Sequence, residues 1–184
     1  RNEIKELEQL LRPLEIRLVS TLDYPEMKEV VEDQETLEGN ALKKAREWHA
    51  RTGLAALADD TGLEVEALGG APGVHSARYA GPDAGDSVNV AKLLKAMEGE
   101  SNRSARFRTV VALVGEEGEH QLFEGVCEGD ILSAPTGDHG FGYDPVFRPS
   151  GYSRSFAELT GEEKNRISHR GLAMKRVLHR LREL

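Results

Sequence analysis

An apolar run at residues 54–58 leads directly into two acids, Asp59 and Asp60, and then into Thr61-Gly62. The run predicts a buried strand, and burying charge without a partner is costly. A strand that ends in two acids before a glycine turn is typical of a ligand site, which open α/β sheets place beyond the carboxyl ends of strands. The acids could hold a divalent cation or take a proton from water, or they could form an Asx-type turn that closes a hairpin. Both interpretations stay open from this pair alone.

Helical and strand patterns alternate through the rest of the chain. Thr36 is a good N-cap and Gly53 a good residue past a helix end, so the apolar positions between them predict a helix. Further helices are predicted over residues 4–14 and 87–97 and from Ser168, strands over 16–19, 63–67, 105–113 and 121–131, a hairpin turn at 116–119, and loops at 69–85 and 133–151. Early alternation with a central hairpin indicates the α/β class with a mixed sheet flanked by helices.

Composition excludes several classes of protein. A length of 184 residues suits one domain, and a net charge of −8 argues against non-specific binding to nucleic acid. The single cysteine, Cys127, is typical of a reducing compartment, and no stretch reaches the roughly 20 apolar residues of a membrane span. We therefore expect a soluble cytoplasmic protein. Because the chain begins at Arg1, without Met and within a helical pattern, we expect residues before it.

A set of acids precedes the helix that starts at Thr36. Mg²⁺ takes oxygen ligands, usually one or two carboxylates together with substrate phosphates, so one of these acids could complete a site with Asp60. The alternative is a solvated acidic loop, and the sequence does not single out one member. The candidates are Glu26, Glu29, Glu32 and Asp33.

The loop at residues 137–145 combines many glycines with two aromatic residues. Its glycines would let backbone approach a flat ligand, Phe141 or Tyr143 could stack on a base, and Asp144 or backbone groups could read the base edge. The alternative is a structural loop with its aromatics in the core. The density of glycine favours the ligand-binding interpretation.

Cationic residues gather in two further segments. Lys164, His169 and Arg170 converge near a helix start, where backbone amides favour anions and an arginine fork could bind a purine, although surface charges are the simpler interpretation. In the segment 72–81, Ser76 and Arg78 could close over phosphates, or the segment could be a plain connection. Lys43 and Lys44 could add positive charge near a phosphate tail.

These four segments together resemble the inosine triphosphate pyrophosphatase family. Order and spacing match over nearly the whole chain, and four blocks in sequence are highly specific. The matching blocks are Ala-Asp-Asp-Thr-Gly-Leu at 58–63, Gly-Ala-Pro-Gly-Val at 70–74 with Ser-Ala-Arg-Tyr-Ala-Gly at 76–81, Gly-Phe-Gly-Tyr-Asp-Pro at 140–145, and Glu-Lys-Asn at 163–165 with Ser-His-Arg at 168–170.

The resemblance implies a single nucleoside triphosphate pyrophosphatase domain over residues 1–184. Its fold would be an elongated α/β structure of two lobes around a long mixed sheet, with the active-site cleft between the lobes. Members of the family are usually homodimers, so a homodimer is implied as well. It implies Mg²⁺-dependent cleavage of ITP, dITP or XTP to the monophosphate and pyrophosphate, which removes non-standard purine nucleotides from the pool.

Residue roles follow from the same resemblance. Asp60 would bind metal and accept the proton of the attacking water, and Glu32 is the best match for an upstream metal ligand. Substrate contacts are implied for Thr61, for the base-pocket residues Phe141, Gly142, Tyr143 and Asp144, and for Lys164, His169 and Arg170.

The sequence departs from the family pattern in two places. The family opens with a strand and a Thr-x-Asn-x-x-Lys phosphate-binding turn, whereas most of that motif is missing here and Glu3 stands near the place of its lysine. Many members also carry Glu immediately before the Asn-Ala pair, where this chain has Gly39, and Glu38 lies one residue earlier. That offset turns a helical side chain by about 100°, so no role passes to Glu38. Two other functions stay open: a nucleotide-binding regulatory protein without hydrolysis, and a pyrophosphatase for another modified nucleotide.

Overall fold

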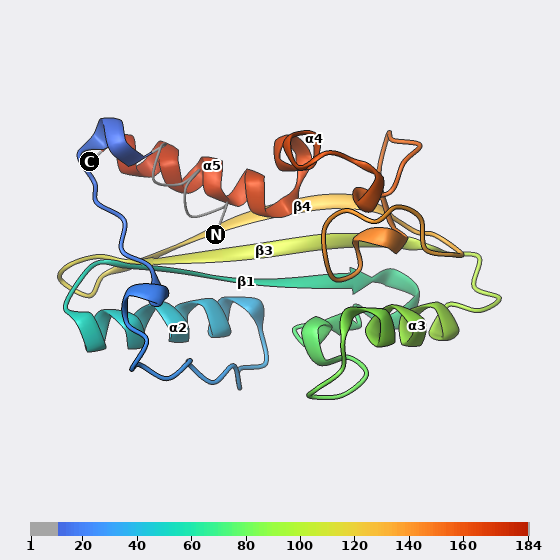
Figure 1. Ribbon diagram of the computed structural model, residues 1–184, viewed down its shortest axis with the longest axis horizontal. Helices are drawn as coiled ribbons and strands as arrows, with labels where there is room; N and C mark the ends of the chain where they lie inside the picture. Colours follow the sequence, from blue (N-terminus) through green and yellow to red (C-terminus); the bar gives the residue numbers. More distant parts are fainter. Residues whose placement is uncertain (1–10, 184) are drawn as a thin grey trace.

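Five strands form one long sheet in the computed structural model, which describes residues 11–183 (Figure 1). Their order is β2-β1-β3-β4-β5, and every pair is antiparallel. The strands are β1 (Ala56–Val65), β2 (Pro72–Gly73), β3 (Ser104–Val114), β4 (His120–Ile131) and β5 (Phe147–Pro149). The predicted α/β class with flanking helices is confirmed. The part of the chain described contributes no parallel pair to the sheet.

The acids Asp59 and Asp60 lie inside strand β1, not at its end. Strand β1 pairs with β3 without a break from Ala56 to Val65, so the predicted turn at Thr61-Gly62 is wrong and the two strands predicted around it are one. The glycine has another purpose, because a Cβ at position 62 would stand 2.5 Å from the carbonyl oxygen of Gly73. Glycine in a strand often marks such a close backbone approach.

Helices cover both faces of the sheet (Figure 1). Helix α2 (Leu37–Thr52) is capped by the Thr36 side chain and by Gly53, as predicted, and packs through Ala41 and Ala45 on Val110 and its neighbours. Helix α5 (His169–Arg182) packs on the other face, where Ala173 and Val177 contact Val111. Strand β3, predicted over residues 105–113, is therefore buried on both faces at its centre.

The far end of the sheet carries a second layer of core. Helix α3 (Asp86–Ala96) lies beside the end of the sheet where Val65 pairs with Ala105, and its apolar residues share a core cluster with both (Figure 1). The long connection from β1 to β3 is thus an excursion and not a crossover, which is why the two strands are antiparallel. Aromatic residues fill this core together with aliphatic residues of α3: Phe107, Phe147, Phe156, Val90, Leu93 and Met97.

Shorter elements complete the structure and correct several expectations. Residues 16–19 form no strand, the loop predicted at 133–151 contains β5, and the last helical region is two helices, α4 (Gly161–Ile167) and α5. Most of the helix predicted over residues 4–14 lies outside the described residues. Within residues 11–183 no helix is long and apolar enough to cross a membrane. Single 3-10 turns are Arg12–Leu14, Thr21–Asp23, Glu66–Leu68, Ser76–Arg78, Asp144–Val146 and Phe156–Glu158.

Candidate active site

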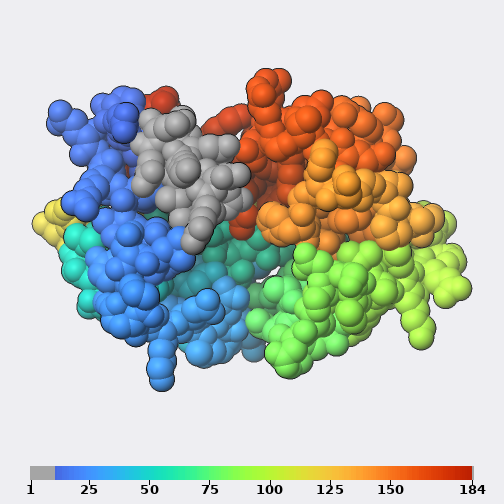
Figure 2. All heavy atoms as spheres, viewed as in Figure 1, coloured from blue at the N-terminus to red at the C-terminus, as the bar shows by residue number. Residues whose placement is uncertain are grey.

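The two adjacent acids of β1 face opposite sides of the sheet, because successive strand side chains alternate. Asp60 faces α2, where its Oδ2 accepts a hydrogen bond of 3.0 Å from Asn40 Nδ2. Asp59 faces α5, where its Oδ2 accepts bonds of 2.9 and 3.1 Å from Nη2 and Nε of Arg170. One edge of β1 is paired with β3 along its whole length. The opposite edge pairs with β2 only at residues 63–64, so no described strand covers that edge beside Asp59 and Asp60. Figure 2 shows β1 (teal) at the floor of a hollow at this edge.

On the α2 face, Asp60 is one of two carboxylates in a small charged cluster. The Asp60 Oδ1 accepts a bond of 3.0 Å from the Thr61 amide, and Lys44 Nζ forms an ion pair with Glu32. Burial raises the pKa of Asp60, and the negative charge of Glu32 raises it further, whereas the Asn40 hydrogen bond and the Lys44 charge oppose the rise. A raised pKa suits a group that must accept a proton near neutral pH.

The same cluster fits a magnesium ion by its donor chemistry. No group of three potential metal ligands occurs within the described part of the chain, so the protein offers two carboxylates at most here. Mg²⁺ is usually held by one or two carboxylates together with substrate phosphates. A cation would also relieve the repulsion between Glu32 and Asp60, which Lys44 now offsets.

The placement of Glu32 is set by contacts of the segment before α2. Arg78 Nη2 donates to the Glu32 carbonyl oxygen at 3.3 Å, and the Gln34 amide donates to Asn40 Oδ1 at 2.9 Å. Asp33 pairs instead with Lys43 at 2.8 Å. Of the four early acids, Glu32 is therefore the one brought beside Asp60, while Glu26 and Glu29 are exposed side chains.

Asn40 is a residue that the sequence interpretation missed. Its side chain is almost completely buried, and its amide binds both the Gln34 backbone and Asp60. The available signal was a polar side chain on the apolar face of α2, one turn before Lys44. A buried amide with both ends bonded fixes the orientation of the carboxylate that it contacts.

On the α5 face, an ion pair links helix α4 to the loop at residues 137–145, called the glycine loop below. Lys164 Nζ lies 2.5 Å from Asp144 Oδ2, and this carboxylate also accepts a bond of 3.1 Å from the Phe141 amide. Burial raises the pKa of Asp144, although Lys164 and Arg170 oppose the rise. Gly140 has φ +74°, and a Cβ there would stand 2.0 Å from Asp144 Oδ2, so the loop needs glycine at this position.

The two aromatic residues of the loop differ in what they can contact. Phe141 is 59% exposed, with Lys164 Nζ 4.8 Å and Arg170 Cζ 5.9 Å from its ring centroid. Tyr143 is buried, and its hydroxyl donates a bond of 2.7 Å to the Ser76 carbonyl oxygen. Phe141 is therefore the aromatic with a free face, and the interpretation of a core aromatic describes Tyr143. Gly142 lies between them, and its amide donates to Asp86.

His169 and Arg170 begin α5, whose N-cap is Ser168. His169 is buried and stacks on Phe107 with ring centroids 4.6 Å apart. Burial, together with the charges of Arg170 and Lys164, lowers the pKa of His169 to about 3, so the imidazole is neutral at physiological pH. Its buried Nδ1 has no hydrogen-bond partner in the structure, which is unusual for a buried polar atom. The alternative that His169 is a surface charge at a helix start is therefore wrong, because the residue is buried and neutral.

The remaining predicted residues have structural contacts. Thr61 Oγ1 lies 2.7 Å from Thr109 Oγ1 on the α5 face. Ser76 Oγ accepts from the Leu63 amide and donates to the Gly73 carbonyl, so this hydroxyl is engaged within the fold. Glu38 pairs with Arg108, in keeping with the absence of a role for it.

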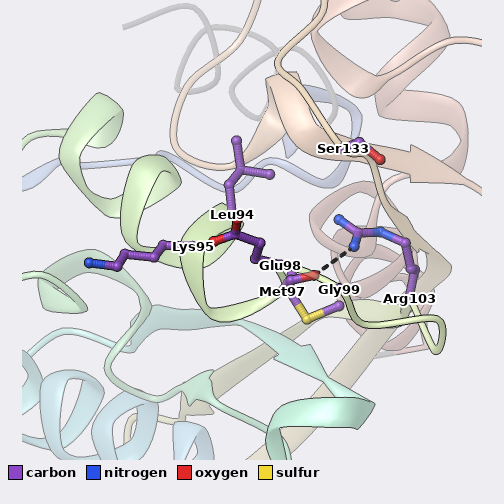
Figure 3. A pocket seen from close by; sticks show the side chains of 7 residues that line it. All are labelled: Leu94, Lys95, Met97, Glu98, Gly99, Arg103 and Ser133. Atoms are coloured by element: carbon purple, nitrogen blue, oxygen red, sulfur yellow. Dashed lines mark hydrogen bonds between the residues drawn. The ribbon is translucent and has the colours of Figure 1, made fainter.

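A separate pocket of about 410 Å³ lies at the end of α3 (Figure 3). Its arginine, Arg103, donates to the backbone carbonyls of Met97 at 3.0 Å, Ile131 at 2.6 Å and Leu132 at 2.9 Å. The guanidinium thus joins α3 to β4. The pocket shares no residue with the charged clusters around Asp60 and around Asp59. Its lining residues are Leu94, Lys95, Met97, Glu98, Gly99, Arg103 and Ser133.

Comparisons with known proteins extend over the whole fold. The sequence model of the Ham1 family matches residues 1–180. The dITP/XTP pyrophosphatase of Desulforamulus reducens is 48% identical, with 100% of this chain and 92% of that protein covered. The dITP/XTP pyrophosphatase of Syntrophobacter fumaroxidans is 52% identical, with 88% and 69% covered. Among solved structures, a HAM1 protein from Coxiella burnetii has a TM-score of 0.93 at 42% identity, with 100% and 94% covered.

Proposed function

Since this chain belongs to the Ham1 family, we propose that it hydrolyses the non-standard purine nucleoside triphosphates ITP, dITP and XTP to the monophosphate and pyrophosphate. The observation that carries the proposal is the geometry of β1. Asp60 bonds to the side chains on the α2 face, where the donor chemistry suits a metal ion and phosphates. Asp59 bonds to Arg170 on the α5 face, where the side chains suit a flat base. A nucleotide laid across the open edge of β1 would reach both groups.

Asp60 is the proposed catalytic base. A water oxygen attacks the α-phosphorus, the bond to the oxygen that bridges to the β-phosphate breaks, pyrophosphate leaves, and Asp60 accepts the proton of the water. The Asn40 amide holds the carboxylate in place during this step. The Mg²⁺ that we propose at Asp60 and Glu32 would, when bound, offset the charge of the phosphate oxygens. Lys44 would then be released from Glu32 to contact phosphate.

Base selectivity is assigned to the α5 face. Phe141 offers its exposed ring for stacking, and Lys164 and Arg170 offer donors beside that ring. The 6-oxo group of hypoxanthine or xanthine accepts such bonds, whereas the amino group of adenine cannot. Asp59 keeps the Arg170 fork in orientation. The amino group of adenine would instead place a donor against these two cations, so the wrong base should bind less tightly.

The assembly and location are also proposals. We expect a homodimer in the cytoplasm, without nucleic acid or membrane partners. The net charge of −8 supports the exclusion of nucleic acid, and the family resemblance supports the dimer. Light scattering coupled to size-exclusion chromatography decides the dimer, since a single peak at the monomer mass would contradict it.

The test of the proposed function is pyrophosphate release from ITP, XTP, GTP and ATP in the presence of Mg²⁺. We expect ITP and XTP to be preferred, and equal rates on all four would refute the specificity.

Asp60→Asn should lose turnover by about 100-fold or more, whereas Asp59→Asn, the neighbouring acid on the other face, should retain turnover and raise KM. Near-parental turnover in Asp60→Asn would remove it from the role of base. Tight ITP binding without pyrophosphate release would favour a nucleotide-binding regulatory protein.

A further inference from the structure

An acid outside the proposed site holds the glycine loop from the opposite side. Asp86, the first residue of α3, accepts a hydrogen bond of 2.8 Å at Oδ2 from the Gly142 amide. No motif in the sequence connects these residues, which lie 56 positions apart. In Figure 2 the orange segment that contains the loop and the green segment that contains α3 meet along a seam.

The bond to Asp86 matters because it ties the loop backbone beside Phe141 to α3, whereas the Asp144 amide, which donates a bond of 3.2 Å to the Phe141 carbonyl oxygen, belongs to the loop itself. Gly140 and Gly142 flank Phe141, and both have positive φ, so the segment has more conformational freedom to lose than other sequences. The two amides at this point each donate to a carboxylate: Phe141 N to Asp144 and Gly142 N to Asp86. The exposed ring of Phe141 is therefore held between an acid on its own loop and an acid on α3. Carboxylate acceptors make the stronger class of hydrogen bond to backbone amides.

We propose that Asp86 is a positioning residue for base recognition, which acts by holding Gly142 and hence the ring of Phe141 in the orientation that stacks on the base. The proposal rests on the proposed function for its substrate. It assigns to α3 a part in nucleotide binding although the helix supplies no group that touches the nucleotide. Loss of the hydrogen bond weakens stacking in the ground state and the transition state alike, so it raises KM and leaves kcat unchanged.

Asp86 also lies in the first turn of α3, where an acid interacts favourably with the helix dipole. Two substitutions separate the two roles. Asp86→Asn removes the charge but keeps an oxygen that can accept from Gly142, so it preserves the hydrogen bond. Asp86→Ala removes both. Asp83→Ala is the matched control, since Asp83 is an exposed acid in the same connection, three residues earlier.

Steady-state kinetics on ITP give the first readout. We expect Asp86→Ala to raise KM by about 3- to 10-fold, the effect of one hydrogen bond, with kcat unchanged. Asp86→Asn, whose neutral oxygen still accepts but more weakly, should raise KM by less, and Asp83→Ala should match the parent. In a Phe141→Ala background the further substitution Asp86→Ala should raise KM by less than about 1.5-fold, because the two residues act as one unit. The same KM factor in both backgrounds, or an Asn variant as impaired as the Ala variant, would overturn the proposal.

Hydrogen exchange on the nucleotide-free protein gives a readout that needs no activity. Amides of residues 137–144 should exchange faster in Asp86→Ala than in the parent, Asp86→Asn or Asp83→Ala. Unchanged exchange in that segment refutes the holding role even if the enzyme is active. If the parent releases no pyrophosphate from any nucleotide, the proposed function fails, and exchange together with the calorimetric affinity for ITP still decides whether Asp86 positions the loop.

Discussion

Removing Lys164 should expose how much stability the buried ion pair of the base pocket controls. Asp144 is nearly inaccessible to solvent, and the Lys164 side chain is only 15% exposed. Lys164→Met removes the counter-charge and leaves a buried carboxylate, which costs about 3–5 kcal/mol. Because a protein of this kind is stable by about 5–15 kcal/mol, the variant keeps a reduced margin. At about 2–4 °C for each kcal/mol, the melting temperature should fall by about 6–20 °C.

The pH dependence of this loss follows from the pKa of Asp144, which burial raises above its ordinary value of 3.8. Without Lys164 the pKa rises further in the folded state, so the folded protein binds a proton that the unfolded chain has released. Between the unfolded and folded pKa values the free energy of unfolding therefore increases as the pH falls. The variant should recover stability on going from pH 8 to pH 5, while the parent, whose pair keeps its counter-charge, should recover less.

Urea unfolding at both pH values measures this effect, and a second substitution checks its cause. Lys164→Met combined with Asp144→Asn removes both charges and should regain most of the lost stability at pH 8. The matched control is Lys43→Met, which breaks an ion pair with the exposed Asp33 and should show neither the loss nor the pH dependence. A loss below about 1 kcal/mol in Lys164→Met, or a larger loss at pH 5 than at pH 8, would refute the reasoning.

Three further outcomes are expected. Asn40→Ala removes a bond that lowers the pKa of Asp60, so the acid limb of the pH profile of kcat/KM should move to higher pH; an unmoved limb would separate Asn40 from the base. Chelation of divalent ions by EDTA should abolish pyrophosphate release and Mg²⁺ should restore it, whereas full activity in EDTA would contradict a metal at Asp60 and Glu32. Gly140→Ala forces a side chain into φ +74° and onto Asp144, so it should destabilise the protein by about 1–3 kcal/mol and raise KM for ITP, as thermal unfolding and kinetics would show.

Features that depend on neighbours in sequence were predictable. The helix between Thr36 and Gly53 was predicted correctly because its capping bonds run over only a few residues. The central hairpin was predictable for the same reason, because the turn at residues 116–119 joins two strands that are adjacent in sequence. The resemblance also named Glu32 among several acids, and the structure brings that residue beside Asp60.

Features that depend on distant partners were not predictable from local pattern. The sequence around Gly62 is that of a turn, but the residue is glycine because Gly73, paired through β2, lies against it. Phe141 and Tyr143 occupy equivalent places in the loop sequence, and the tyrosine faces inward because its ring packs in the core and its hydroxyl bonds to the Ser76 carbonyl oxygen. Asn40 was missed because its partner, Asp60, is 20 residues away on another element.

The opposite orientation of Asp59 and Asp60 makes the chemistry of this protein sensitive to insertions and deletions. A single residue gained or lost in β1 ahead of the acids would exchange their faces, since the side-chain period of a strand is two. Asp60 would then meet Arg170, Asp59 would meet Asn40, and the residues after them would be displaced as well. Length changes in the 133–136 connection carry no such penalty, because no alternating pattern runs through it. Variation in length among descendants of this sequence should therefore gather in its loops and spare β1 completely.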